Sequence, residues 1–320
     1  MPKLCFIKYC LNCILIPLVL LAVFRAPLWL FSALILVIAA LALHEFFGVV
    51  RGYGVEPLVI VTHTVQAIFF VTLGFMANWA SDSELGLITM LAPGTLLMVL
   101  MFVVMLAALG RENLATALPS IAYSTFGLVY IGFSLATIVF IRISNLGSFL
   151  LLYLFIVVWS GDTFAYYVGR SMGRHKLAPA ISPKKTWEGA IASVVGSSIL
   201  GVLLLHYMPQ IVAWLHRIGA MPHLEWRTME AWRRMTETPI SEIAVPPLML
   251  AIGLSVLLNI AAQLGDLVES QMKRGANIKD SGTMLPGHGG ILDRIDALLL
   301  AAPAALVLFE VFAQKLVQIR

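Results

Sequence analysis

Long apolar stretches alternate with short polar segments along the whole chain. Nine of these stretches approach the length of about 20 residues that a helix needs to cross the hydrocarbon core of a bilayer. They lie at 9–24, 28–48, 57–76, 87–108, 117–141, 148–168, 188–208, 243–268 and 290–314. A spanning segment must satisfy its backbone hydrogen bonds internally, so each stretch is expected to be a helix. The pattern predicts an all-α polytopic membrane protein, a bundle of about nine transmembrane helices.

The composition agrees with a chain that lies mostly in lipid. Of the 320 residues, 60% are hydrophobic and only 12% are charged, and the mean hydropathy is +0.93. Soluble domains carry about 25% charged residues, and their surfaces must meet water. The net charge of +4 is explained by Lys and Arg in loops that face an anionic leaflet. The chain has no basic run interleaved with aromatic residues, so a nucleic-acid partner is not expected.

The Lys and Arg residues indicate the orientation of the chain. The loops 169–187 and 269–289 are basic, and both follow even-numbered spans. The positive-inside rule places both loops in the cytoplasm, with the active side of the protein facing the cytoplasm. We therefore expect N-terminal membrane helices over 1–145, about five spans, and a catalytic membrane region over 146–320. The polar segment 209–242 is expected to be an insertion, either an interfacial amphipathic helix or a packed extramembrane hairpin.

Carboxylates, basic residues and glycines gather between 262 and 296. Asp266 and Lys273 are spaced i, i+7 on one helix face, and Asp293 and Asp296 are spaced i, i+3 on the next helix. The basic residues that could donate to phosphate oxygens are Lys273, Arg274, Lys279, His288 and Arg294. The glycines between the helices could turn backbone N–H groups toward a phosphate. This set suits phosphoryl-type transfer with Mg²⁺, whereas a loop between ion-paired helix ends would explain only a few of the charges.

A second group of charges lies between 160 and 190. Asp162 is in or near a membrane helix, where an ionisable residue is costly and therefore a candidate for function. Lys184 and Lys185 precede the next helix, which Ser182 or Thr186 could cap. Two lysines at a helix start could bind a phosphate, or they could simply anchor the loop at the cytoplasmic surface.

These segments resemble one protein family. The stretches SQMKR (270–274), KDSG (279–282) and LPGHGGILDRID (285–296) resemble the signature of the phosphatidate cytidylyltransferase (CDP-diacylglycerol synthase) family. The stretches DTFAYYVGR (162–170) and SPKKTWEG (182–189) also resemble it.

The resemblance implies the residues of the site. The expected catalytic residues are Asp266, Lys273, Arg274, Asp293 and Arg294, with Asp266 and Asp293 as metal ligands. The expected substrate-binding residues are Lys184, Lys185, Thr186, Lys279, His288, Gly289 and Gly290. The residues expected to orient these side chains, without contacting metal or substrate themselves, are Asp162, Glu188, Asp280 and Asp296.

The resemblance also implies the reaction and its partners. CTP and phosphatidate would give CDP-diacylglycerol and pyrophosphate, a step of phospholipid biosynthesis. The expected cofactor is Mg²⁺ as two metal ions, with a monovalent cation as an open alternative. The expected partners are CTP, phosphatidate, membrane lipids and a second copy of the chain in a homodimer. The expected location is the inner cell membrane, as an integral multi-pass protein.

Two other classes of protein also place aspartates at membrane depth. A transporter could use intramembrane aspartates to relay ions, but no paired broken helices occupy matching halves of the chain. An intramembrane aspartyl protease would need a G-x-G-D pattern. The pattern fails because Trp159 and Gln263 stand where the first glycine belongs.

Overall fold

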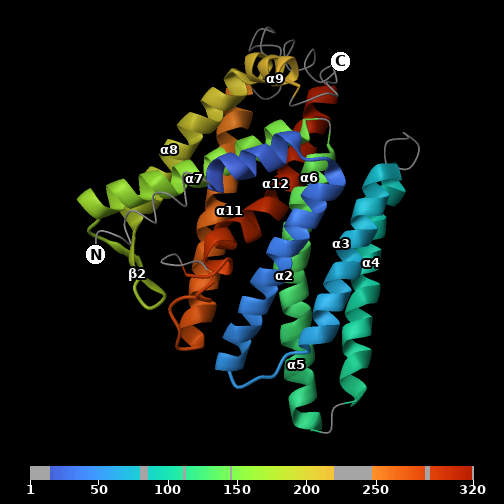
Figure 1. The fold of residues 1–320 in the computed structure, drawn as a ribbon. Helices are drawn as coiled ribbons and strands as arrows, with labels where there is room; N and C mark the ends of the chain where they lie inside the picture. Colours follow the sequence, from blue (N-terminus) through green and yellow to red (C-terminus); the bar gives the residue numbers. More distant parts are fainter. Residues whose placement is uncertain are drawn as a thin grey trace. The chain divides into compact units, whose positions relative to one another are not determined.

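The structure is a computed structural model that describes residues 15–79, 86–110, 113–144, 146–219, 247–284 and 289–318, and nearly all of these residues are helical (Figure 1). After a first helix, Leu15–Arg25, the N-terminal elements are α2 (Leu28–Gly52), α3 (Val59–Trp79), α4 (Gly86–Ala107), the 3₁₀ turn η1 (Ala108–Gly110), α5 (Leu114–Gly127), the π-helical segment η2 (Leu128–Phe133) and α6 (Ser134–Ile143). The later elements are α7 (Gly147–Met172), β1 (Lys176–Ala178), β2 (Ser182–Thr186), α8 (Trp187–His206), α9 (Met208–Arg217), α11 (Pro247–Gly275) and α12 (Leu292–Gln318).

Helix length and composition confirm the predicted class, an all-α polytopic membrane protein. Among the described residues, five helices are long and apolar enough to cross a membrane. They are Leu28–Gly52, Leu114–Ile143, Gly147–Met172, Trp187–His206 and Leu248–Gly275. Three shorter apolar helices lie at Leu15–Arg25, Val59–Phe75 and Gly94–Gly110. The count of nine spans stays a prediction.

The chain divides into two compact units. Unit 1 consists of the described residues within 1–19, 26–139 and 269–296, and unit 2 of those within 20–25, 140–268 and 297–320. The segment 269–296 therefore folds with helices from the first part of the chain. The predicted functional division near residue 145 is a different kind of boundary and stays a prediction.

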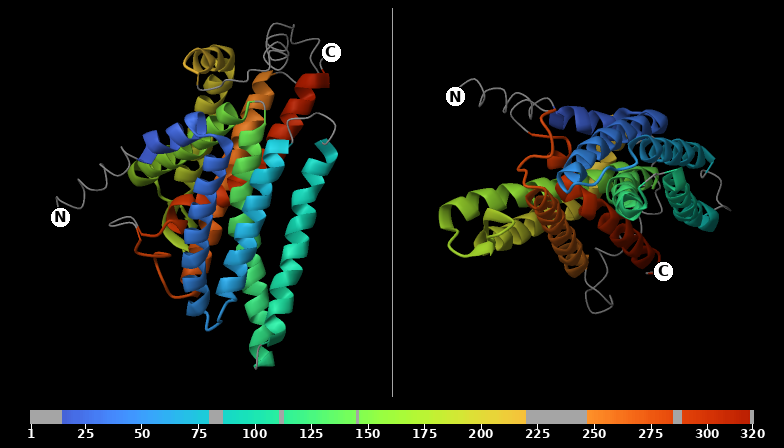
Figure 2. Two further views of the ribbon diagram at one scale, coloured as in Figure 1. Left: turned by 45° about the vertical axis from the view of Figure 1, so that its right-hand side comes forward. Right: turned by 90° about the horizontal axis from the view of Figure 1, so that it is seen from below.

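Unit 1 has its core where α2, α3, α4 and α5 lie side by side (Figure 2). Phe46 of α2 and Phe69 of α3 are buried in it, together with Leu128 of η2. The helices approach closely where side chains are small. A Cβ at Gly127 would meet Leu43 and Phe46 at 2.9 Å, so only glycine fits this crossing.

Unit 2 has its core along α7 and α8, which pack side by side (Figure 2). A Cβ at Gly196 of α8 would overlap the ring of Phe164, so glycine lets the two helices approach. Polar side chains then tie α11 to these helices. Asn259 of α11 donates to Ser193 of α8 at 3.0 Å, and the hydroxyls of Tyr153 and Ser255 lie 2.7 Å apart. Such bonds are favoured at membrane depth, where water does not compete for the polar groups.

The structure corrects the bounds of both predicted loops. The segment after α7 contains a small antiparallel hairpin, in which Lys176 lies opposite Thr186 and Ala178 opposite Ser182. The second loop starts only after Gly275, because α11 continues about two turns beyond the predicted span end. Lys273 is therefore a helical residue and not a loop residue.

The predicted insertion 209–242 lies mostly outside the described residues. Its described beginning is α9, an amphipathic helix. Met208, Val212 and Leu215 are buried on one side of α9, and Trp214 is exposed. Both alternatives, an interfacial helix and a packed hairpin, stay open for this segment.

Candidate active site

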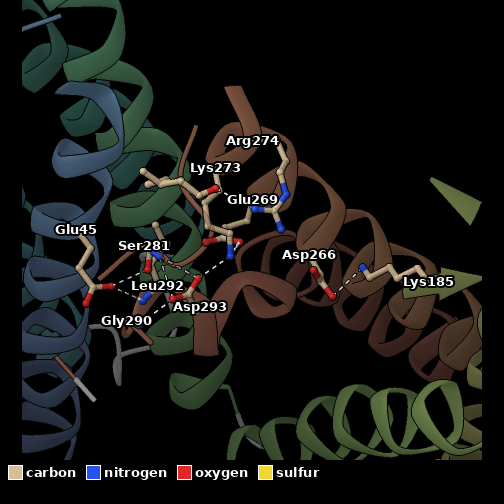
Figure 3. Close-up of polar contacts among 11 residues, drawn as sticks. Glu45, Lys185, Asp266, Glu269, Lys273, Arg274, Ser281, Gly290, Leu292 and Asp293 are labelled. Atoms are coloured by element: carbon tan, nitrogen blue, oxygen red, sulfur yellow. Dashed lines mark hydrogen bonds and ion pairs between the residues drawn. The ribbon is translucent and has the colours of Figure 1, made fainter. Parts of the chain in front are cut away.

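Lys273 is the centre of a buried ion-paired cluster in unit 1. Its Nζ donates to Asp293 Oδ1 at 2.5 Å and also pairs with Glu269, one turn earlier on α11 (Figure 3). The Glu269 side chain is 1% exposed, and those of Lys273 and Asp293 are 10% exposed. Two carboxylates thus share one ammonium group. Both contacts lie in a place that water hardly reaches, so neither carboxyl group can exchange the ammonium for solvent without cost.

Asp293 also organises the backbone of the glycine-rich loop. Its carboxylate accepts from the backbone N–H of Ser281 at 3.0 Å and from that of Gly290 at 2.7 Å. It belongs to the first turn of α12, where a carboxylate is stabilised by the helix dipole. Gly289 has φ +79°, a left-handed conformation that favours glycine. One side chain therefore holds two points of the loop, Ser281 and Gly290.

Glu45 is a site residue that the sequence analysis missed. It lies about two turns before the end of α2, is 6% exposed, and accepts three hydrogen bonds from the loop and from the start of α12 (Figure 3). The donors are Ser281 Oγ at 3.1 Å, Ile291 N at 3.0 Å and Leu292 N at 2.8 Å. A signal was present in the sequence, because an ionisable residue inside an apolar span is a candidate for function.

The end of α2 is also joined to the end of α11 in unit 1. Tyr53, just after α2, donates from its hydroxyl to the carbonyl of Met272 at 2.8 Å. Burial raises the pKa of Tyr53, and the neighbouring Tyr123 raises it further, so the phenol stays protonated as a donor. A Cβ at Gly52 would lie 2.9 Å from the Cβ of Ala276. The close approach fixes the point where the loop leaves α11.

A second ion pair lies in unit 2. Lys185 of β2 contacts Asp266 of α11, with Nζ 2.7 Å from Oδ2 (Figure 3). Both side chains keep some access to solvent, at 26% and 33% exposed. Asp162 of α7 lies close enough to Lys185 and Asp266 to interact electrostatically with both. This cluster brings together three of the predicted site residues.

The hairpin that carries Lys185 is fixed to the start of α8. Thr186 is the N-cap of α8 and accepts from Gly189 N at 3.2 Å, as one of the two alternatives for the cap predicted. Glu188 lies in the first turn and contacts His175 Nδ1 at 2.6 Å. The backbone N–H of Trp187 donates to the carbonyl of His175 at 2.9 Å. Lys184 and Lys185 thus belong to a strand before the helix and not to its first turn.

Most of the other predicted residues are exposed to solvent. Lys184, Arg274, Lys279, Asp280 and Arg294 are exposed. Arg274 donates to the carbonyl of Ile278 at 2.9 Å, which closes the end of α11. Asp296 is half-buried on α12, and His288 lies outside the described residues.

The donor set fits a hard cation such as Mg²⁺. Asp266 and Asp293 offer carboxylate oxygens, and each now holds a lysine ammonium as its cation. The described part of the chain holds no group of three or more His, Cys, Asp or Glu arranged to bind a metal. Mg²⁺ commonly takes one or two protein carboxylates and completes its octahedron with substrate phosphates and water. A magnesium site at Asp266 or Asp293 therefore stays a prediction.

The apolar helices define a multi-pass membrane protein. Each of its two units also contains an ion-paired cluster. The chain belongs to the Cytidylyltransferase family, whose profile matches residues 7–312. The phosphatidate cytidylyltransferase of Haemophilus influenzae is 38% identical over 157 residues, which are 49% of this chain and 44% of that protein. The enzyme of the same name from Bacillus subtilis is 35% identical over 196 residues, 60% of each chain. That of Rickettsia bellii is 33% identical over 184 residues, 58% of this chain and 68% of that protein.

These matches cover only part of the relatives. The chain spans about half the length of the Haemophilus influenzae protein and 60% of the Bacillus subtilis protein. The profile match over residues 7–312 nevertheless establishes the family, and the apolar helices establish the membrane class.

Proposed function

We propose that the protein transfers the cytidylyl group of CTP to phosphatidate. A phosphate oxygen of phosphatidate forms a bond to the α-phosphorus of CTP, and the bond from that phosphorus to the oxygen bridging to the β-phosphate breaks. The products are CDP-diacylglycerol and pyrophosphate. The observation that carries this proposal is the identity of 33% to 38% with relatives named phosphatidate cytidylyltransferase.

The ion-paired clusters supply what such a transfer needs from the protein. Phosphoryl-type transfer asks mainly for positioning and for charge to balance the phosphates. Lys273 holds Asp293 and Glu269 in fixed places, because its ammonium is shared by both carboxylates. The exposed basic residues Arg274 and Lys279 are the proposed donors to phosphate oxygens. Arg294, exposed at the start of α12, is proposed to act in the same way.

Lys185 and Lys184 have different proposed roles although they are neighbours. Lys185 is paired with Asp266, so it controls the charge at that carboxylate when no substrate is bound. Lys184 is exposed on the same strand and could bind a lipid phosphate at the leaflet surface. Thr186 and Glu188 hold the strand at the start of α8 and thereby hold both lysines.

Asp266 and Asp293 are the proposed ligands of Mg²⁺. A bound magnesium ion would polarise the phosphoryl oxygens and neutralise the charge of the leaving pyrophosphate. The proposed number of metal ions is two, one of which a monovalent cation could replace. Asp162 and Asp296 are proposed to orient these carboxylates and the basic residues without contacting the metal themselves.

We further propose where the protein works. The basic segments that contain Lys176 and Lys279 face the cytoplasm, where CTP is found, and phosphatidate enters from the surrounding leaflet. The membrane is the inner membrane of the cell, and the protein acts as a homodimer.

The test is transfer of label from CTP into lipid by the purified full chain. We expect labelled lipid only when CTP, phosphatidate and Mg²⁺ are all present. Label that appears with a different lipid phosphate and not with phosphatidate would change the proposed acceptor. Transport of an ion without nucleotide, with no labelled lipid, would favour the transporter class instead.

A further inference from the structure

Glu45 is an unusual residue for a buried position of an apolar helix. The next two residues of α2 are the buried Phe46 and Phe47, and the ordinary expectation for such a position is an apolar side chain. An unpaired carboxylate there would be strongly unfavourable. Glu45 is kept because the loop 276–291 and the start of α12 offer it hydrogen-bond donors.

The donors are arranged so that both carboxylate oxygens are used. Oε1 accepts from Ile291 N, and Oε2 accepts from Leu292 N and from Ser281 Oγ. The first N–H groups of a helix have no partner inside the helix, and they are normally satisfied by the side chain of a nearby capping residue. In α12 this task falls to Glu45, which lies about 246 positions away in the sequence.

Two glycines of the loop make room for this carboxylate. A Cβ at Gly282 would lie 2.5 Å from Glu45 Oε1, and a Cβ at Gly290 would overlap Oε2. Both positions therefore need glycine while Glu45 is present. Glycine is thus required at two positions of the signature segment because Glu45 of α2, a helix distant in the sequence, lies against them.

Ser281 links Glu45 to the ion-paired cluster. Its hydroxyl donates to Glu45 and its backbone N–H donates to Asp293. Glu45 also holds the backbone of Leu292, the residue directly before Asp293. A shift of Glu45 must therefore move the residues that set the position of the Asp293 carboxylate.

We propose that Glu45 is a positioning residue that clamps the glycine-rich loop and the start of α12 onto α2. It holds Asp293 and the loop in the geometry that the site requires. It acts through Ser281, Ile291 and Leu292 and does not itself touch a substrate. The clamp stands on these contacts alone, whereas its effect on turnover rests on the proposed cytidylyl transfer.

The test is hydrogen exchange of the full chain in lipid nanodiscs, measured by mass spectrometry on peptides that cover 276–296. In Glu45→Gln only one oxygen remains as an acceptor, and the amide NH₂ faces backbone donors. We expect exchange of these peptides to become about tenfold to a hundredfold faster, while peptides from α3 and α4 keep the wild-type rate. The matched control is Glu56→Gln, because Glu56 is exposed and pairs with Arg51 in the last turn of α2. The control should exchange as the wild type does.

A second variant approaches the clamp from the loop side. Gly290→Ala pushes a methyl group against Glu45 and should speed exchange in the same peptides, without any change at Glu45 itself. Both variants should lower kcat more than they raise the KM for CTP. Both variants should remain folded, with one cooperative thermal transition.

The outcomes separate the clamp from the proposed reaction. Wild-type exchange over 276–296 in both variants would overturn the clamp, as would a uniform rise in exchange over the whole chain. If the wild-type protein forms no CDP-diacylglycerol, the proposed function fails. Faster exchange confined to 276–296 would still support the clamp in that case.

Discussion

Lys273 donates from Nζ to Asp293 at 2.5 Å and joins the end of α11 to the start of α12 in unit 1 (Figure 3). The same ammonium pairs with Glu269. The signature segment thus contains its own cation, buried between two carboxylates. Charge balance at this place is a structural requirement as well as a chemical one.

The first prediction concerns that balance. Lys273→Met leaves Glu269 and Asp293 buried without their cation, and breaking a buried ion pair in this way costs about 3–5 kcal/mol. We expect a lower free energy of unfolding by that amount in detergent-based denaturation. Lys279→Met is the control, because Lys279 is exposed, and its effect should stay within about 0.5 kcal/mol. Equal stability of the two variants would show that the cluster does not depend on Lys273.

The second prediction concerns the proposed metal ligands. Asp266→Asn and Asp293→Asn each remove a charged oxygen ligand with little change of shape. We expect each variant to remain folded by its thermal midpoint and to lose transfer of label into lipid. Near wild-type turnover at limiting Mg²⁺ in either variant would remove that residue from the set of metal ligands.

The third prediction separates the two neighbouring lysines. Loss of a charge-assisted contact costs about 1.5–3 kcal/mol, which is about tenfold to a hundredfold in kcat/KM. Lys185→Ala should show such a loss, because Lys185 is paired with Asp266. Lys184→Ala should act mainly on the dependence on phosphatidate, measured at a fixed ratio of detergent to lipid. If Lys184→Ala leaves both substrate dependences intact, that lysine only anchors the strand.

In unit 1, Arg274 should affect the dependence on CTP and not that on phosphatidate. Arg274 is exposed at the end of α11, directly after the buried Lys273. We propose that this end of α11 serves CTP. Arg274→Ala should raise the KM for CTP by about tenfold or more and leave the dependence on phosphatidate nearly unchanged. An effect on phosphatidate alone would reverse the assignment.

The fourth prediction concerns orientation in the membrane. A variant without Cys5, Cys10 and Cys13, the only cysteines of the sequence, can carry one new cysteine at Lys279 or at Arg217. Both positions are exposed in the structure, whereas Ala276 is buried and unsuited to labelling. An impermeant thiol reagent should label position 279 only from the cytoplasmic side and position 217 only from the outside. Labelling of position 279 from outside would contradict a cytoplasmic CTP site.

Local patterns were sufficient to predict some of these features. Hydrophobic stretches gave the helices, and Thr186 was among the expected caps for α8 because its side chain needs only a partner three residues away. The place of Asp293 in the first turn of α12 was likewise expected from the sequence. These features depend on neighbours in the chain, which a single sequence displays.

Contacts between distant segments could not be predicted in the same way. Glu45 lies among apolar residues, and nothing nearby in the sequence indicates Ile291 or Ser281 as its partners. The hairpin of β1 and β2 was missed because Pro183 and two lysines are unusual in a strand. Its antiparallel pairing and its contacts with the start of α8 outweigh that weak local preference.

The most direct measurement follows the two ends of the triphosphate in parallel reactions of the purified protein. CTP labelled at the α-phosphate and CTP labelled at the γ-phosphate are each incubated with phosphatidate and Mg²⁺. We expect the α label to enter the lipid phase and the γ label to be released as pyrophosphate in equal molar amount. Asp266→Asn should do neither. Release of γ label as inorganic phosphate, with no α label in lipid, would contradict cytidylyl transfer by this protein.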